Sequence, residues 1–365
     1  MKRSLCIVLT GGGTIGHVAP VLAVVDALRS IAQRRHLSIE LHYIGRRKGT
    51  EQTLIEKAGL PFIGISAGKL RRYVDLQNLI DPFRVMVGFF EAIGVLIRLR
   101  PDVLFAKGGY VSLPVVIAAS FLRIPIVAHE TDSILGLANR FAARVATTLC
   151  VAFPIEQYRH QGIRTSLVQT GNPVRTEFFG SSQQVRTAPP FTVVVFGGSQ
   201  GSQSINRAIE ALIDQPLSSC SIIHLTGRSH FSQFAARAST WYHPIDYTDH
   251  LADLLHQADL VISRSGGSVF ELAAAARPTI LIPLSSSANQ HQQSNAQYFA
   301  NHQAAVVVEE SDLTPESLRQ QVSDLLKDVR GRRTLSRQIH SLAVPDAAQR
   351  VATVILDSGE KRRAR

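Results

Sequence analysis

Residues Thr10 to Pro20, TGGGTIGHVAP, lie between the apolar run LCIVL and the helical pattern VLAVVDALR. Glycines at such a strand-to-helix junction let the chain turn tightly and bring backbone N–H groups close to a ligand. The positive end of a helix that starts near Val18 would point at the same place. The stretch therefore predicts an anion-binding loop at the carboxyl end of a parallel strand.

Short apolar runs alternate with helical patterns along the whole chain, which is typical of βα units on a parallel sheet. The pattern restarts at residues 191–212, FTVVVFGGSQGSQSINRAIEAL, where a second apolar run meets a second glycine loop. We therefore expect an α/β protein with two Rossmann-like, doubly wound domains facing across a cleft. The expected domains are residues 1–173 and 191–344, with a linker over 174–190 and a final helix at about 345–358 that can pack back on the first domain.

The composition indicates anionic partners. The chain of 365 residues has 39 Lys and Arg against 28 Asp and Glu, a formal net charge of +11. Nucleic acid, an acidic membrane surface and phosphorylated small molecules all fit this balance. The 3 cysteines lie in apolar runs, which favours buried thiols in a reducing cytosol. The longest apolar segment, 83–97, contains Arg84 and Glu91 and falls short of the roughly 20 residues of a spanning helix, and no signal peptide is expected.

Further loops carry side chains suited to a nucleotide sugar. In FGGSQGSQSIN, Ser199 offers a hydroxyl and an N–H to a phosphate oxygen, and the loop lacks the Gly-Lys-Ser/Thr ending of a nucleoside triphosphatase. In SRSGGSVFE, Glu271 lies about one turn into a helix, where it can accept hydrogen bonds from ribose hydroxyls or complement the helix dipole. The amide-rich stretch 289–295 suits sugar hydroxyls or a solvated loop.

A dinucleotide site is the alternative for the first loop. The dinucleotide-binding motif includes an acidic residue at the end of the next strand, but here that strand ends YIGRRKGT. Arginines there would suit a phosphorylated ribose, which leaves an NADP-dependent oxidoreductase open.

Taken in order, the motifs resemble the MurG family, the cytoplasmic N-acetylglucosaminyltransferases of peptidoglycan synthesis. The matching pieces are TGGGTIGHVAP, SAGKLRRYVDLQNLIDPF, KGGYVSLPVVIAA, HETDSILGLANR, TGNPVR, GGSQGSQSIN, SRSGGSVFE and HQQSNA. The resemblance implies the GT-B fold and inverting transfer of N-acetylglucosamine from UDP-N-acetylglucosamine to undecaprenyl-linked lipid I, which gives lipid II. It implies a peripheral protein on the cytoplasmic face of the plasma membrane, with no cofactor and no metal.

The resemblance also implies donor contacts. Matching positions are Thr14, Ile15, Gly16, Asn139, Arg175, Ser199, Thr248, Glu271 and Gln292. Glu271 would hold the ribose, Ser199 and Arg175 the pyrophosphate, and Gln292 with Asn139 the transferred sugar. The chain departs from the family pattern at Ile15, where a second glycine is common, and in SGGSVFE, which is one residue shorter before the glutamate.

Inverting transfer needs a base for the acceptor hydroxyl and groups that stabilise the departing UDP. His17 is the first candidate for the base, because imidazole titrates near neutral pH and the glycine loop places it at a strand end. A histidine there can instead donate a hydrogen bond to a substrate oxygen. Glu130 in HETDS is the second candidate, and the sequence holds no Asp-x-Asp pair for a divalent ion.

The segment from Lys69 to Arg100 is the expected membrane contact. It has a basic cluster, Lys69, Arg71 and Arg72, followed by an apolar helix that Asp81 is expected to cap before Pro82. Such a helix is either buried or offers an apolar stripe to lipid. We expect Leu79, Phe83 and Val87 to face an anionic membrane.

Other functions remain open on sequence grounds alone. A GT-B transferase with a soluble acceptor and a non-catalytic UDP-sugar binder share most of these features. A nucleic-acid partner is not expected, because the sequence has no recognition helix or RNA-binding signature.

Overall fold

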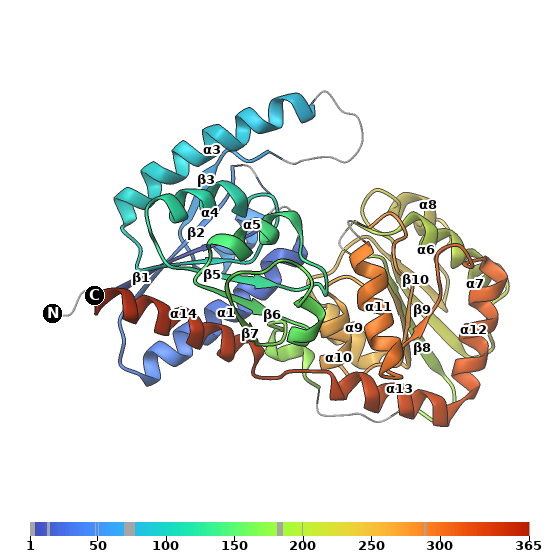
Figure 1. Ribbon diagram of the computed structural model, residues 1–365. Helices are drawn as coiled ribbons and strands as arrows, with labels where there is room; N and C mark the ends of the chain where they lie inside the picture. The colour runs from blue at the N-terminus through green and yellow to red at the C-terminus, as the bar shows by residue number, and fades with distance from the viewer. Residues whose placement is uncertain are drawn as a thin grey trace. The chain divides into compact units, whose positions relative to one another are not determined.

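The computed structural model describes residues 4–12, 15–47, 49, 51–68, 77–180, 185–198, 200–287 and 290–364, and of residues 15, 17 and 77–80 it describes the backbone alone. The chain divides into two compact units. Unit 1 comprises residues 1–175 and 346–365, and unit 2 comprises residues 176–345. Each unit is built on its own parallel sheet (Figure 1).

Unit 1 is a doubly wound α/β unit. Over the described residues its sheet has the order β3-β2-β1-β4-β5-β6-β7, and all neighbouring strands are parallel. Its strands are β1 (Leu5–Thr10), β2 (Ile39–Arg46), β3 (Phe62–Ile65), β4 (Val103–Ala106), β5 (Ile126–Glu130), β6 (Thr148–Val151) and β7 (Ser166–Gln169). Its helices are α1 (Ile15–Arg34), α2 (Glu51–Lys57), α3 (Gln77–Leu99), α4 (Ser112–Phe121), α5 (Leu137–Val145), the 3₁₀ helix η1 (Ile155–Tyr158) and α14 (Ala347–Arg363).

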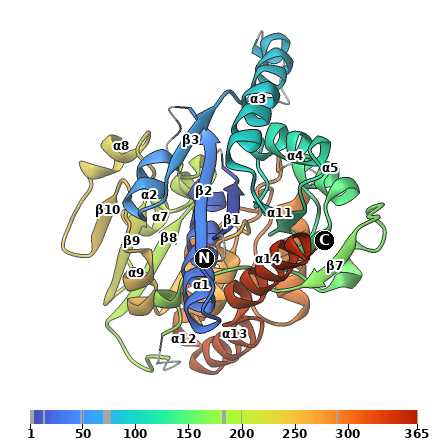
Figure 2. The ribbon, with the colours of Figure 1, turned by 90° about the vertical axis from the view of Figure 1, so that its left-hand side faces the viewer.

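The core of unit 1 forms around β1, all of whose residues are buried. A central parallel strand is covered by helices on both faces, which explains its unbroken apolar run. Helices α1 and α14 lie side by side on one face (Figures 1 and 2). Their apolar residues recur at helical spacing and share one cluster with β1, namely Val18, Val21, Val24 and Leu28 of α1 and Val351, Ala352, Ile355 and Leu356 of α14.

Unit 2 repeats this plan. Over the described residues its sheet has the order β10-β9-β8-β11-β12-β13, again parallel throughout. Its strands are β8 (Phe191–Phe196), β9 (Cys220–Leu225), β10 (Tyr242–Ile245), β11 (Leu260–Ser263), β12 (Thr279–Leu281) and β13 (Val306–Val307). Its helices are the 3₁₀ helix η2 (Thr176–Phe178), α6 (Gln203–Ala208), α7 (Glu210–Asp214), α8 (Phe231–Ala235), α9 (Leu251–Gln257), α10 (Val269–Ala274), α11 (His291–Asn301), α12 (Pro315–Lys327) and α13 (Val329–Ser341).

Local sequence signals account for several helix ends in unit 2. Helix α12 begins with a capping box, in which the Thr314 hydroxyl accepts the Ser317 N–H and the Ser317 hydroxyl accepts the Thr314 N–H, and Pro315 follows the cap. Helix α13 is capped by Asp328, whose Oδ1 accepts the Gly331 N–H at 2.9 Å.

The predicted fold class is confirmed, since both units are parallel-sheet α/β units with the Rossmann strand order. Two predicted helix limits were wrong. Helix α3 begins at Gln77, so Asp81 lies inside it, where its buried carboxylate pairs with Arg84 at 3.0 Å. Pro82 lacks an N–H and so removes only one backbone hydrogen bond from this long helix. The helix can therefore begin before Pro82.

Helix α14 extends to Arg363, beyond the expected end near residue 358. The last turn is anchored in unit 1, because Arg362 donates to the Pro101 carbonyl at 3.0 Å and Arg363 pairs with Asp102 at 2.8 Å. None of the helices in the described part of the chain combines the length and apolarity that crossing a bilayer requires.

Candidate active site

The loops after β1 and β4 meet where the strand order of unit 1 reverses, which is the usual ligand position in such sheets. Their backbones touch directly. The Gly12 N–H donates to the Gly108 carbonyl at 3.4 Å, and a Cβ on Gly109 would lie 2.1 Å from the Gly12 carbonyl oxygen. Gly109 also has a φ of +80°, which disfavours other residues. The glycines of these two loops are therefore required to bring the backbones together.

Glu130, at the end of β5, holds the loop that follows this strand through hydrogen bonds. Its carboxylate accepts N–H bonds from Thr131 and Asp132 at 2.8 and 3.0 Å, from Gly136 at 2.9 Å and from the Asn139 amide at 3.0 Å. Burial raises the pKa of the Glu130 carboxyl and nearby Asp132 adds to this, while the N–H donors oppose it. A carboxylate that already accepts these bonds serves to position a loop.

A buried polar network continues from Glu130 to the next strands. The Lys107 ammonium donates to the Thr131 hydroxyl, which in turn donates to Asn172 Oδ1 at 3.0 Å. Burial lowers the pKa of Lys107 to about 8, against the opposing effect of the Glu130 and Asp132 carboxylates. The network joins the loops that follow β4, β5 and β7.

His129 belongs to the same network. Its Nε2 lies 2.9 Å from the Gly171 carbonyl oxygen, and burial, together with the charge of Lys107, holds its pKa well below the usual value. His129 therefore stays neutral at physiological pH and links the end of β5 to the TGNP stretch after β7.

Unit 2 also has a pair of touching loops, which follow the neighbouring strands β8 and β9. A Cβ on Gly201, whose φ is +77°, would lie 2.1 Å from the Thr226 carbonyl oxygen. A Cβ on Gly227 would lie 2.4 Å from the Gln200 carbonyl oxygen. Ser202 then caps α6 by accepting the Ile205 N–H at 3.4 Å. The second glycine loop is thus fixed by the same backbone-to-backbone packing as the first.

Glu310 and Arg264 hold the loops of unit 2 together, and the sequence reasoning did not identify either. The Arg264 guanidinium pairs with Glu310 at 2.6 Å and donates to the Ser204 hydroxyl at the same distance. Glu310 also accepts the Ser204 hydroxyl at 2.5 Å and the Ser285 N–H at 3.0 Å. Burial alone would raise the pKa of Glu310, but the bonds from Ser204, Ser285 and Arg264 lower it to about 2.

These contacts tie α6 to the loops after β11, β12 and β13. The only sequence signal for the clamp was the arginine inside SRSGGS, and its partner lies 46 positions away. A charged residue at a buried strand end usually has such a partner.

Predicted donor residues of unit 2 lie at the carboxyl ends of its strands. Glu271 lies in the first turn of α10, partly exposed, directly after the glycines that follow β11. Gln292 is the second residue of α11 and its Oε1 accepts the Leu284 N–H at 3.0 Å. Thr248 follows β10, and its hydroxyl accepts the His250 N–H at 2.9 Å.

In unit 1, Gly16 is an exposed residue at the start of α1, and Arg175 is half-buried after the TGNPV stretch. Asn139 is buried, and its amide nitrogen donates to Glu130 and to the His129 carbonyl oxygen at 3.0 Å. A contact of Asn139 with a sugar would have to use Oδ1, the amide atom with no partner among the described residues.

Several predicted site residues fall outside the described residues. They are Thr14, Ser199, Lys69, Arg71 and Arg72. Ile15 and His17 lie in the first turn of α1, and Leu79 lies in α3, with only their backbones described.

Helix α3 carries an exposed apolar face. Phe83, Met86, Val87 and Phe90 recur at helical spacing, and 64% of Phe83 and 65% of Phe90 is exposed. Phe121, at the end of α4, is 74% exposed and packs edge-on against Phe89 of α3. Phe83 and Val87 are therefore exposed, as expected.

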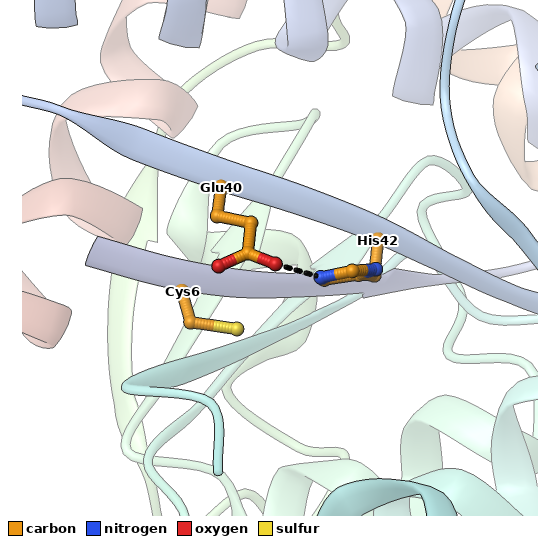
Figure 3. Close-up of side chains that lie close together, drawn as sticks. All are labelled: Cys6, Glu40 and His42. Carbon is orange, nitrogen blue, oxygen red and sulfur yellow. Dashed lines mark hydrogen bonds and ion pairs between the residues drawn. The ribbon is translucent and has the colours of Figure 1, made fainter. Parts of the chain in front are cut away.

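A group of possible metal ligands among the described residues lies at the other end of β1. Cys6, Glu40 and His42 have ligand atoms within 4.8 Å of one another (Figure 3). His42 Nε2 lies 2.7 Å from Glu40 Oε1, so the two side chains already satisfy each other. Cys6 is near the amino end of β1, away from the glycine loop, and the group takes no part in the site described above.

Comparisons with known proteins agree with this geometry. Residues 7–151 match the glycosyltransferase family 28 N-terminal domain and residues 192–351 match the family 28 C-terminal domain. The UDP-N-acetylglucosamine–N-acetylmuramyl-(pentapeptide) pyrophosphoryl-undecaprenol N-acetylglucosamine transferase of Clostridium perfringens is 39% identical over 88% of this chain and 90% of its own. The enzyme of the same name from Lachnospira eligens is 38% identical over 88% of this chain and 91% of its own.

Solved structures have the same architecture. The crystal structure of Acinetobacter baumannii MurG superposes with a TM-score of 0.72 at 25% identity, over 96% of this chain and 99% of that one. A UDP-N-acetylglucosamine 2-epimerase superposes with a TM-score of 0.68 over 98% of this chain and 96% of its own, but its 12% identity indicates a shared fold alone.

We expect Glu310→Gln to lower the free energy of unfolding of unit 2 by about 2–3 kcal/mol at pH 7, because the buried Arg264 guanidinium loses its charged partner. The pKa of Glu310 is lowered to about 2, so its contribution is present above about pH 4.5 and is lost as the pH falls towards 2. The difference between variant and wild type should therefore shrink below about pH 4.5.

Urea unfolding followed by the fluorescence of Trp241, the sole tryptophan, reports on unit 2. Glu309→Gln removes an equal charge from an exposed neighbour and should leave the midpoint unchanged. If Glu310→Gln lowers the free energy of unfolding by the same amount at every pH, the charge of Glu310 does not stabilise the loops.

Proposed function

The chain belongs to glycosyltransferase family 28, and from this premise we propose that it transfers N-acetylglucosamine from UDP-N-acetylglucosamine to lipid I. The acceptor is the N-acetylmuramoyl sugar linked through pyrophosphate to undecaprenol, and the product is lipid II. The observation that carries this proposal is the 39% identity to an enzyme of that name over 88% of the chain. The two pairs of touching glycine loops supply the backbone N–H groups that a nucleotide sugar requires.

The donor binds mainly to unit 2 in this proposal. Glu271 accepts hydrogen bonds from the ribose hydroxyls, which its position in the first turn of α10 supports. Ser199 and Arg175 bind the pyrophosphate, and Gln292 and Asn139 bind the transferred sugar. The remaining donor contacts are Thr14, Ile15, Gly16 and Thr248. Arg264 acts indirectly, because its guanidinium is committed to Glu310.

The transfer inverts the anomeric carbon and uses no metal. The acceptor hydroxyl loses its proton to a base while its oxygen attacks the anomeric carbon, and the bond to the UDP oxygen breaks. Loop N–H groups and Arg175 stabilise the negative charge that develops on the departing pyrophosphate. This arrangement of fixed donors supports a mechanism in which the protein supplies the positive potential itself.

His17 is the base, and Glu130 positions the loop beside it. A base needs a free lone pair, and the Glu130 oxygens already accept N–H bonds from Thr131, Asp132, Gly136 and Asn139. His17 follows the first glycine loop in the first turn of α1, at the carboxyl end of the central strand. Its imidazole takes the proton near neutral pH.

The apolar face of α3 binds the membrane that holds the acceptor. Exposed phenylalanines rarely gather on one helix face unless they meet a partner or lipid. The preceding Lys69, Arg71 and Arg72 would lie next to anionic headgroups, and the net charge of +11 favours the same surface. The protein is thus peripheral, on the cytoplasmic face of the plasma membrane.

The proposed reaction is tested by UDP release with purified protein, UDP-N-acetylglucosamine and lipid I, in the presence of EDTA. We expect UDP release that requires lipid I, persists in EDTA and gives a β-linked disaccharide, since the donor sugar is α-linked and inversion changes the configuration. Release without any acceptor, or with a soluble sugar alone at equal rate, would assign the chain a different acceptor. Loss of activity in EDTA would contradict the metal-free mechanism.

We expect His17→Ala to reduce turnover by about 10²–10⁴-fold, the usual contribution of a general base. The dissociation constant of UDP-N-acetylglucosamine should stay within about threefold of wild type. The acid limb of the pH–rate profile should disappear in the variant. His160→Ala, at an exposed position of unit 1, is the control and should behave as wild type. Wild-type turnover in His17→Ala would remove this residue from the mechanism.

We expect Phe83→Ser with Phe90→Ser to weaken binding to phosphatidylglycerol vesicles by at least tenfold, because each phenylalanine contributes about 1.5–3 kcal/mol when buried. Vesicle co-sedimentation at low and high salt measures this. Leu137→Ser removes an exposed apolar side chain from α5 instead and should not change binding. Equal binding by the double variant and the control would show that α3 is not the membrane contact.

A further inference from the structure

Unit 2 contains a large cavity on the side of its sheet opposite to the proposed donor site. It encloses about 1280 Å³, more than the roughly 300–1,000 Å³ of common small-molecule sites. Three of its lining residues mark the amino ends of strands, namely Thr192 on β8, Asp259 before β11 and Arg277 before β12. The glycine loops follow the carboxyl ends of β8 and β11, so the cavity is separate from them.

The lining is strongly basic. It includes Arg186, Arg277, Arg330, Arg333 and Arg337, and Asp259 is the one carboxylate among the described lining residues. Asp259 Oδ2 accepts the Thr192 N–H at 2.8 Å and Oδ1 lies 3.6 Å from Arg186 Nε. Arg277 is 9% exposed and donates to the Ala258 carbonyl at 3.1 Å. The carboxylate can therefore balance only one of the arginines.

Three of these arginines lie on one face of helix α13, the face that lines the cavity. Arg330, Arg333 and Arg337 are three and four positions apart, a spacing at which like charges destabilise a helix. Within the described part of the chain no hydrogen bond or ion pair of these side chains is found, and Arg330, Arg333 and Arg337 are exposed.

The rotation of α13 is fixed by its other face. Arg332 is fully buried, donates to the Leu325, Arg186 and Leu326 carbonyls at 3.0 Å each, and stacks on Phe191 at 4.9 Å. Leu335 and Ile339 are buried on the same side. The arginines of the cavity therefore cannot turn away together to separate their charges.

Unit 1 has an aspartate at the equivalent place, beside the arginines that end α14. Asp102 precedes β4 and accepts the Cys6 N–H of β1 at 2.8 Å, as Asp259 does for Thr192 of β8. Arg363 of α14 pairs with Asp102 at 2.8 Å. One arginine is thus enough to pair with this aspartate. The further arginines that line the cavity of unit 2 need another explanation.

We propose that this cavity binds a small oligophosphate, a molecule with three or more adjacent phosphate groups. Guanidinium groups match phosphate oxygens in pairs, and arginines one helical turn apart, about 5 Å, suit a row of phosphates better than a single one. The buried Arg277 lies beyond the reach of a flat bilayer. The described lining contains no Phe, Tyr or Trp side chain on which a nucleic-acid base would stack.

Calorimetric titration of the full-length protein with tripolyphosphate, in saturating UDP to block the donor site, tests the proposal. We expect micromolar binding that weakens at least tenfold in Arg333→Gln/Arg337→Gln. Arg237→Gln/Arg319→Gln, which removes two arginines of unit 2 outside the cavity, should bind as wild type. Both side chains of the test variant are exposed, so Trp241 fluorescence should show unchanged unfolding.

Two further binding measurements, with vesicles and with RNA, distinguish an oligophosphate site from a membrane or RNA site. Phosphatidylglycerol vesicles and a short RNA should bind the test variant and the control variant equally, because both variants lose two positive charges and binding to an extended polyanion depends on the overall charge. Selective loss of vesicle or RNA binding in the test variant, without tripolyphosphate binding, would overturn the proposal. So would tripolyphosphate binding that UDP abolishes or that the test variant retains in full.

Discussion

The glycine loops of both units depend on backbone segments that pass each other with no space for a Cβ atom. In unit 1 the contact is between Gly109 and the Gly12 carbonyl, and in unit 2 it is between Gly201 and the Thr226 carbonyl. Glycines carry no side chain that could cover the backbone of these loops. The proposed binding of a nucleotide sugar uses this property, because a phosphate can then approach the backbone itself.

Each unit stabilises its loops with one carboxylate that accepts several donors. Glu130 uses backbone N–H groups close in sequence, whereas Glu310 joins Ser204, Arg264 and Ser285 from distant parts of unit 2. Charge-assisted bonds of this kind are stronger than neutral ones, and they fix loop geometry before a substrate arrives. The same saturation makes Glu130 unsuited to proton transfer, which is why we propose His17 as the base.

Much of this fold could be predicted from sequence, because its determinants are local. The apolar run of β1 and the glycines after it are contiguous, and so are the repeats of this pattern after β4, β8 and β11. The Arg264–Glu310 clamp could not be predicted, since it joins residues that only the folded sheet brings together. The ends of α3 and α14 were missed for a similar reason. Helix α14 continues to Arg363 because that residue meets Asp102, a contact that helix propensity does not encode.

The two units share one scaffold but use the amino edge of the sheet differently. In both, an aspartate before the fourth strand of the sheet accepts an N–H from the first strand, and an arginine pairs with that aspartate. In unit 1 the arginine comes from α14, whose apolar face completes the core around β1. In unit 2 the corresponding edge has a cavity lined by arginines. Because the proposed substrate loops lie at the carboxyl edges of both sheets, the amino edge of unit 2 is where a second ligand can bind without competing with the donor.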